Sequence, residues 1–169
     1  MTIRLLVTGS RTWLDGDGTA ERVALLTTEL HKMLRDLCPI RPTALPILVH
    51  GGARGVDMLA ADLWEQWGLP VEPHRAKWSE CGEHCPSDKS CRRIRRGRKY
   101  CTRAGFRRNA VMVALGADAC IAFIHNESQG ATQCAELAEH AGIPTTRIPY
   151  PPTSRHGELH GTPEYRPGA

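Results

Sequence analysis

The chain has 169 residues, with 22 Lys and Arg against 18 Asp and Glu, so its formal net charge at pH 7 is only +4. This length predicts a single domain with a substantial core. The mild positive charge suits an anionic ligand but does not by itself indicate nucleic acid. No apolar run reaches the roughly 18 residues that span a bilayer. The seven cysteines fit a reducing compartment better than a disulfide framework, so we expect a cytoplasmic protein without membrane contact.

Short apolar runs and segments of helical periodicity alternate along residues 3–148. We expect strands at 3–8, 47–50, 70–74, 119–124 and 143–148, and helices at 19–37, 56–67, 106–115 and 131–141. The alternation is typical of βαβ units. It predicts an α/β, Rossmann-like three-layer fold, with a mainly parallel sheet of about five strands and helices on both faces.

Two segments do not follow this alternation. Residues 75–104 are rich in Cys, Arg and Lys and form an insert after the third strand, within the single domain 1–148. Residues 149–169 are rich in Pro and Gly and nearly lack aliphatic side chains. This composition predicts a flexible tail, because the segment cannot bury enough apolar surface to offset its chain entropy.

Glycine-rich or small polar turns follow three of the strands: "GSR" at 9–11, "GGARGVD" at 51–57 and "HNESQGAT" at 125–132. Parallel sheets bind ligands at the carboxyl ends of their strands. Glycine permits close backbone approach, and a helix N-terminus offers unpaired N–H groups to a phosphate. The predicted ligand-binding residues are Gly9, Ser10, Arg11, Gly51, Gly52, Ala53, Arg54, Gly55, Asp57, Arg108, Asn109, Ser128, Gly130 and Thr132. The alternative is that these turns only connect strands to helices.

Catalysis is less clearly indicated. Hydrolysis requires a carboxylate or imidazole near the attacking water, and the candidate carboxylates are Asp57, Glu127 and Glu136. Asp57 either caps its helix or pairs with Arg54, or it contacts a ribose hydroxyl. His50 and His125 end strands at the same edge, where a histidine more often hydrogen-bonds a turn than acts as a base. No complete catalytic constellation emerges.

An ordered set of motifs resembles the SLOG superfamily of Rossmann-like domains, related to the DNA-processing protein DprA and to the LOG phosphoribohydrolases. The motifs are "VTGSR" at 7–11, "HGGARGVDMLA" at 50–60, "GFRRNAVMV" at 105–113 and "SQGAT" at 128–132. The most similar group is the YspA/YpsA-related domain of unknown function, widespread in phages and actinobacteria. The resemblance implies a phage or actinobacterial source, a nucleotide or nucleotide-sugar ligand, and a homodimer or larger homo-oligomer.

The same resemblance allows the chain to be compared with the catalytic motif of the LOG enzymes. LOG enzymes cleave ribose 5-phosphate from nucleoside monophosphates with a PGGxGTxxE motif and an arginine on the preceding helix, a position that Arg108 occupies here. In this chain the Pro-Gly-Gly is absent, and Glu136 follows Thr132 one place later than the motif requires. One residue rotates a helical side chain by about 100°. The departure favours ligand binding over turnover.

The insert carries a second candidate site. Cys81, Cys85, Cys91 and Cys101, with His84 as an alternative ligand, provide donors for a structural zinc. Free thiols or one disulfide are the alternatives. Six cations occupy residues 92–99, and the insert leaves the sheet on its ligand side, which favours a lid. Trp78 and Tyr100 flank this segment and either stack on a base or anchor the loop.

Three functions follow from these observations. The first is a sensor or sequestering protein that binds a nucleotide or an ADP-ribose-like nucleotide sugar, with no organic cofactor. The second is a nucleotide hydrolase that cleaves an N-glycosidic bond. The third is single-stranded nucleic-acid binding through the basic insert, which would weaken steeply with added salt.

Overall fold

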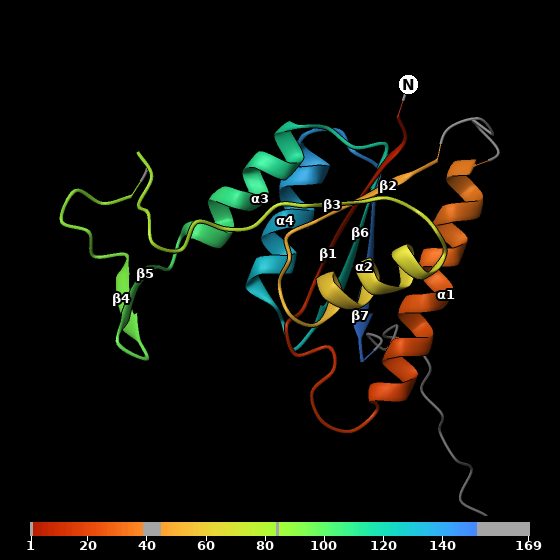
Figure 1. Cartoon of the computed structure of the whole chain (residues 1–169), viewed down its shortest axis with the longest axis horizontal. Coiled ribbons are helices and arrows are strands. Elements are labelled where there is room, and N and C mark those ends of the chain that lie inside the picture. The colour runs from red at the N-terminus through yellow and green to blue at the C-terminus, as the bar shows by residue number, and fades with distance from the viewer. Residues whose placement is uncertain (1, 39–44, 84, 152–169) are drawn as a thin grey trace, which may run out of the picture.

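A computed structural model describes residues 2–38, 45–83 and 85–151. Five parallel strands form one sheet in the order β3-β2-β1-β6-β7 (Figure 1). The strands are β1 (Arg4–Gly9), β2 (Ile47–His50), β3 (Val71–Pro73), β6 (Ala119–His125) and β7 (Thr145–Tyr150). The helices are α1 (Thr19–Leu37), α2 (Val56–Gln66), α3 (Ala104–Ala114) and α4 (Gln129–His140). The predicted α/β class, sheet and insert are confirmed.

The sheet is buried on both faces, as the alternating side chains of β1 require. Leu5 and Val7 pack with α1 and α2, where Leu26 and Trp64 complete the larger core. Leu6 points to the other face, which α3 and α4 cover with smaller side chains. The strands therefore read as continuous apolar runs in the sequence, the pattern expected of a parallel sheet.

The chain order places one reversal in the sheet, between β1 and β6. From β1 the chain proceeds outward to β2 and β3, then crosses back to β6 and continues to β7. The loops after β1 and β6 consequently lead to helices on opposite faces and leave a crevice between them. Such a reversal is where open parallel sheets bind their ligands.

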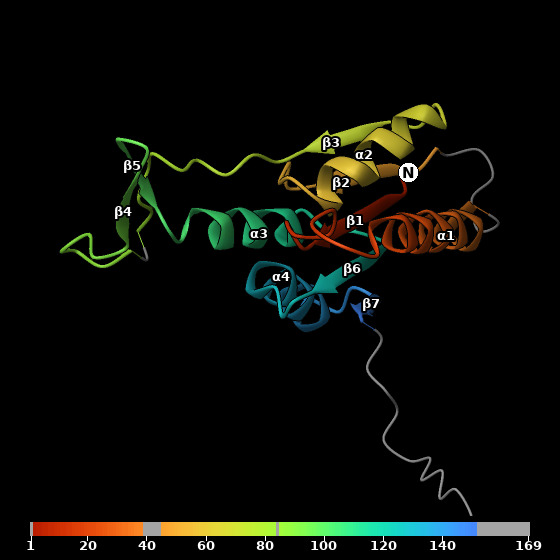
Figure 2. The ribbon, with the colours of Figure 1, turned by 90° about the horizontal axis from the view of Figure 1, so that it is seen from below.

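The insert holds a β-hairpin that the sequence analysis did not anticipate. Strands β4 (Arg92–Arg95) and β5 (Arg98–Cys101) pair antiparallel around a turn of Arg96 and Gly97, both with positive φ. Two such residues form the tight turn that matches strand twist. Figures 1 and 2 show the hairpin standing apart from the sheet, beyond the N-terminal end of α3.

The element bounds differ little from the predicted ones. Helix α3 begins two residues earlier than expected, and β7 extends to Tyr150, because Pro149 and Tyr150 pair with the end of β6. The predicted tail therefore begins with two strand residues, and the rest of it from residue 152 lies outside the described residues. None of the described helices is both long and apolar enough to cross a membrane.

Candidate functional site

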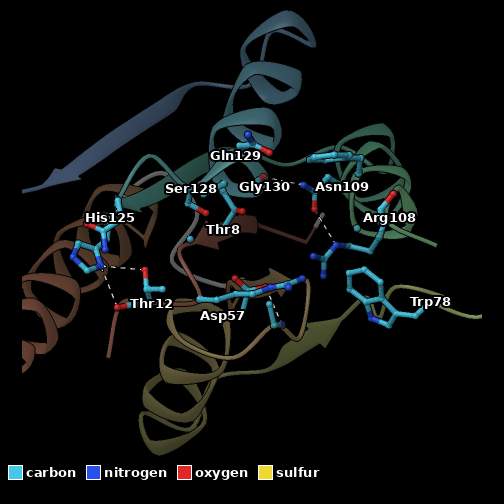
Figure 3. Close-up of a pocket in the computed structure, with 18 of the residues that line it drawn as sticks. Thr8, Thr12, Asp57, Trp78, Arg108, Asn109, His125, Ser128, Gln129 and Gly130 are labelled. Carbon is cyan, nitrogen blue, oxygen red and sulfur yellow. Dashed lines mark hydrogen bonds between the residues drawn. The ribbon is translucent and has the colours of Figure 1, made fainter. Parts of the chain in front are cut away.

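A cavity of about 450 Å³ opens at the reversal point, between the carboxyl ends of β1 and β6 (Figure 3). Its walls come from the loop after β1, the first turns of α2, α3 and α4, and the insert. The lining residues are Thr8, Gly9, Arg11, Thr12, Ala53, Asp57, Trp78, Tyr100, Thr102, Gly105, Phe106, Arg108, Asn109, His125, Asn126, Ser128, Gln129, Gly130 and Ala131. We call this space the switch-point cavity.

The N-terminus of α4 forms its polar end. Ser128 is the N-cap residue and makes no side-chain capping bond, and residues 128–131 all line the cavity. The first N–H groups of a helix have no carbonyl partner within it, and they carry the positive end of the helix dipole. Buried Asn109 fixes this end, because its Nδ2 donates to Gly130 O at 3.0 Å and to Gln133 Oε1 at 2.9 Å. The arrangement favours an anion.

Aromatic side chains from the insert and α3 form another wall. Trp78 and Phe106 remain 38% and 39% exposed, which leaves ring surface open to a ligand. The rings of Trp78 and Tyr100 meet edge to face at 6.5 Å, and the guanidinium of Arg11 lies 5.4 Å from the Trp78 ring centre. Such a wall is suited to stacking a planar base.

Asp57 is the buried acid of the cavity and also organises the glycine turn. Its Oδ2 accepts hydrogen bonds from the N–H groups of Gly51 at 3.0 Å and Ala53 at 3.2 Å. Burial raises the pKa of Asp57 to about 6, although Arg108 and these N–H groups oppose the shift. The Gly52 N–H donates to His50 Nδ1 at 3.3 Å. The N–H groups of Gly51, Gly52 and Ala53 are therefore engaged within the protein.

Arg108 connects the cavity to the strand edge. Its Nη1 donates to His74 O at 3.1 Å and its Nε to Asn109 Oδ1 at 2.9 Å. A Cβ at Gly51 would overlap its guanidinium, so glycine at this position makes room for the arginine. Figure 3 shows Arg108 between Trp78 and Asn109, facing the cavity.

The structure brings most, but not all, of the predicted ligand-binding residues to this cavity. The residues that line it are Gly9, Arg11, Ala53, Asp57, Arg108, Asn109, Ser128 and Gly130. Gly51, Gly52 and Arg54 line a neighbouring cavity. Ser10 is fully buried, where its Oγ accepts from His125 N at 2.7 Å, and Gly55 and Thr132 line neither cavity.

The catalytic candidates do not assemble. Glu127 and Glu136 are exposed and lie outside the lining, so Asp57 is the carboxylate among its residues. His125 does line the cavity, where its Nδ1 lies 3.2 Å from Thr12 Oγ1. Sequence reasoning did not identify Thr8, Thr12, Thr102 and Phe106 as lining residues, whereas Asn126 and Gln129 lie in the predicted turn at 125–132 but were not named individually. Apart from their position near strand ends or helix starts, these residues carry no signal.

The four cysteines of the insert gather into one cluster, which we call the thiol cluster. The sulfurs of Cys81, Cys85, Cys91 and Cys101 all lie within 4.8 Å of one another. The Cys81–Cys91 and Cys85–Cys101 pairs are 3.6 Å apart, and Cys91–Cys101 is 3.7 Å. Tetrahedral Zn–S bonds of about 2.3 Å give sulfur separations of about 3.8 Å. His84 lies outside the described residues, and all seven cysteines are free thiols.

Arg107 adjoins the thiol cluster. Its Nη1 donates to the sulfurs of Cys85 at 3.1 Å and Cys101 at 3.3 Å, and its Nη2 donates to Glu80 O. Burial opposes ionisation of Cys101, but the hydrogen bond from Arg107 lowers the pKa of this thiol. A cation that donates to the sulfurs favours the thiolate form, which is the form that binds metal. The geometry of the cluster is compatible with a structural metal.

Comparison with known proteins gives one informative match. The chain is 37% identical over 147 residues to the Gene 61 protein of Mycobacterium phage D29, and the match covers 83% of this chain and 92% of that protein. No protein-family profile and no solved structure matches it. The phage relative supports the phage origin expected from the sequence. At this identity and coverage, the chain belongs to the same protein family as the Gene 61 protein of phage D29.

Proposed function

We propose that this protein binds a nucleotide or nucleotide sugar in the switch-point cavity, as a sensor or sequestering protein of the SLOG type. The observation that carries the proposal is the pairing of two features in one cavity. The start of α4 provides an anion site, and Trp78 with Tyr100 and Phe106 provides stacking surface. A volume of about 450 Å³ lies within the usual range of ligand sites.

Binding without turnover fits the cavity better than hydrolysis does. An acid–base catalyst needs a carboxylate free to exchange a proton with water or substrate. Asp57 Oδ2 is instead occupied by two backbone N–H groups. Glu136, which follows Thr132 one place later than the LOG motif requires, is exposed on α4 away from the lining.

Trp78→Ala is expected to weaken nucleotide binding by about tenfold or more, because stacking on an aromatic ring is worth about 1–3 kcal/mol per base. Calorimetric titration of the full chain with AMP, ADP-ribose and NAD measures the effect. Trp78→Phe is the matched control, since it keeps an aromatic face and is expected to retain most of the affinity. Equal affinity of the alanine variant and the wild type would refute stacking at this wall.

For the insert, we propose a structural zinc held by the thiol cluster. The cluster sits in a segment with a small apolar core, made mainly of Cys91, Cys101 and Ala104. Such segments gain much of their order from a bound metal. Tetrahedral thiolate coordination is typical of zinc, and the absence of an open position would make the site structural rather than catalytic.

Elemental analysis of the purified chain is expected to find about one zinc per chain. Cys101→Ser is expected to lose that zinc, since it removes one of the four ligands. Cys38→Ser serves as the control, because Cys38 lies at the end of α1, outside the cluster, and its loss is expected to leave the zinc in place. A folded wild type without metal would remove the zinc proposal.

A further inference from the structure

A second cavity adjoins the first and is lined by five arginines. It encloses about 570 Å³ between the glycine turn after β2 and the insert. Its guanidinium-bearing residues come from five separate segments: Arg11, Arg54, Arg75, Arg95 and Arg108. The other lining residues are Gly51, Gly52, Ala53, Ala76 and Trp78, so no carboxylate contributes to this wall. We call this space the arginine cavity.

The positive charges of the arginine cavity are only partly compensated within the protein. Arg54 makes a 3.5 Å ion pair with Asp15, but both side chains are more than half exposed. Within the part of the chain that the structure describes, the side chains of Arg75 and Arg95 have no hydrogen-bond or ion-pair partner. Gathering cations in this way is unfavourable without a counter-charge. The cavity is thus suited to phosphate groups, which guanidinium binds in a bidentate manner.

The basic surface continues from this cavity along the hairpin. A third hollow of about 1020 Å³ shares Arg11, Trp78 and Arg95 with the arginine cavity and shares Tyr100 with the switch-point cavity. It adds Arg96, Arg98 and Lys99 from the β4–β5 hairpin. The acid in its lining is Glu80, which lies 3.7 Å from Lys77. The three hollows form one track with Trp78 at their junction.

We propose that the ligand of this track is single-stranded nucleic acid. One nucleotide occupies the switch-point cavity, the neighbouring phosphates lie in the arginine cavity, and the strand continues over the hairpin. The inference rests on the proposed nucleotide site and extends it. A mononucleotide would leave the cations of the arginine cavity and hairpin without counter-charge, whereas a phosphodiester chain matches them along the track. The half-exposed ring of Trp78 requires an unpaired base, because a duplex keeps its base faces stacked inside.

The test compares a mononucleotide with a strand. The affinities of AMP and of a fluorescent oligodeoxyadenylate of about eight nucleotides are measured with the full chain between about 50 and 200 mM salt. The oligomer is expected to bind at least tenfold more tightly at low salt and to show the steeper salt dependence. The double variant Arg95→Ala with Arg98→Ala is expected to lower the slope for the oligomer by about 1.4, about 0.7 for each lost phosphate contact. The affinity of this double variant for AMP is expected to stay within about twofold of the wild-type value.

Arg35→Ala is the control for the loss of a surface charge outside the track, since Arg35 is exposed in the last turn of α1. An oligomer that binds no more tightly than AMP, or a slope that the double variant leaves unchanged, would overturn the strand proposal while the nucleotide site stands. Oligomer binding that AMP does not compete with and Trp78→Ala does not weaken would overturn both. Equal affinity for the matching duplex would overturn the single-strand assignment. A parallel series with ribo-oligomers establishes whether the strand is DNA or RNA.

Discussion

Gly55→Ala is expected to reduce the free energy of unfolding by about 3–5 kcal/mol. Gly55 is the N-cap residue of α2 with φ 84° and ψ −126°, a conformation essentially reserved for glycine, whose cost for other residues is about 1–3 kcal/mol. An added Cβ would also overlap the carbonyl oxygens of Ser10 and Arg11. These backbone atoms cannot rotate away as a side chain can, and overpacking costs a further 1–3 kcal/mol or so. Urea unfolding at neutral pH measures the loss.

Gly68→Ala provides the matched control. Gly68 also has a positive φ, 73°, but nothing lies within 4 Å of the Cβ that alanine would add. Only the backbone cost remains, about 1–2 kcal/mol for a left-handed alanine. If both variants lost the same stability, the close approach of the β1 loop to α2 would not be a determinant of the fold.

At Gly55 the conformation of the turn was predictable from the sequence, but its purpose was not. The cluster of glycines after β2 predicted a turn with unusual backbone freedom, which the structure confirms for Gly52 and Gly55. The sequence could not show whether that freedom admits a ligand or another part of the chain. Gly55 admits the carbonyls of the β1 loop, and Gly51 admits the guanidinium of Arg108. Contacts between segments far apart in the sequence decide this, and local composition does not encode them.

The sheet and helices were more predictable than the site. Periodicity suffices for β1 or α1, because burial against the sheet imposes a regular spacing of apolar residues. The hairpin β4–β5 lacks that spacing, since its aliphatic residue, Ile94, is 68% exposed. Its pairing depends on the turn at Arg96 and Gly97 and on the adjacent thiol cluster. Stacking by Trp78 and Tyr100 was one of two predicted alternatives, but Phe106 was not identified, and the position of Trp78 beside Arg11 depends on the fold of the insert.

Acidification from pH 7 to pH 4 is expected to change the free energies of unfolding of Asp57→Asn and His50→Gln in opposite directions relative to the wild type. The groups concerned are Asp57 and His50, which are both 3% exposed and flank the glycine turn. Burial raises the pKa of Asp57 from 3.8 to about 6. Burial, with the nearby charges of Arg108, His74 and Arg75, lowers the pKa of His50 from 6.5 to about 4. Each shift of about two units corresponds to about 3 kcal/mol of linkage.

The two shifts have opposite signs. Between pH 7 and pH 4 the folded state protonates Asp57 before the unfolded state does, so acidification stabilises the fold through this group. Over the same interval the unfolded state protonates His50 first, so acidification destabilises the fold through the histidine. In the wild type the two contributions largely cancel. Asp57→Asn removes the stabilising contribution. Between pH 7 and pH 4, its free energy of unfolding is therefore expected to fall by about 3 kcal/mol more than that of the wild type.

His50→Gln removes the destabilising contribution. Over the same interval, its free energy of unfolding is expected to rise by about 3 kcal/mol relative to that of the wild type. Urea unfolding of the wild type, both single variants and the double variant at pH 7 and pH 4 measures these differences. Other titrating groups, such as Glu72, are common to all four proteins, so their effects cancel in the comparison. Opposite shifts in the two single variants, together with a double variant that matches the wild type, would show that both groups titrate as buried neighbours of the turn. Parallel pH dependence in all four would mean that neither side chain is buried in the folded protein as the structure has it.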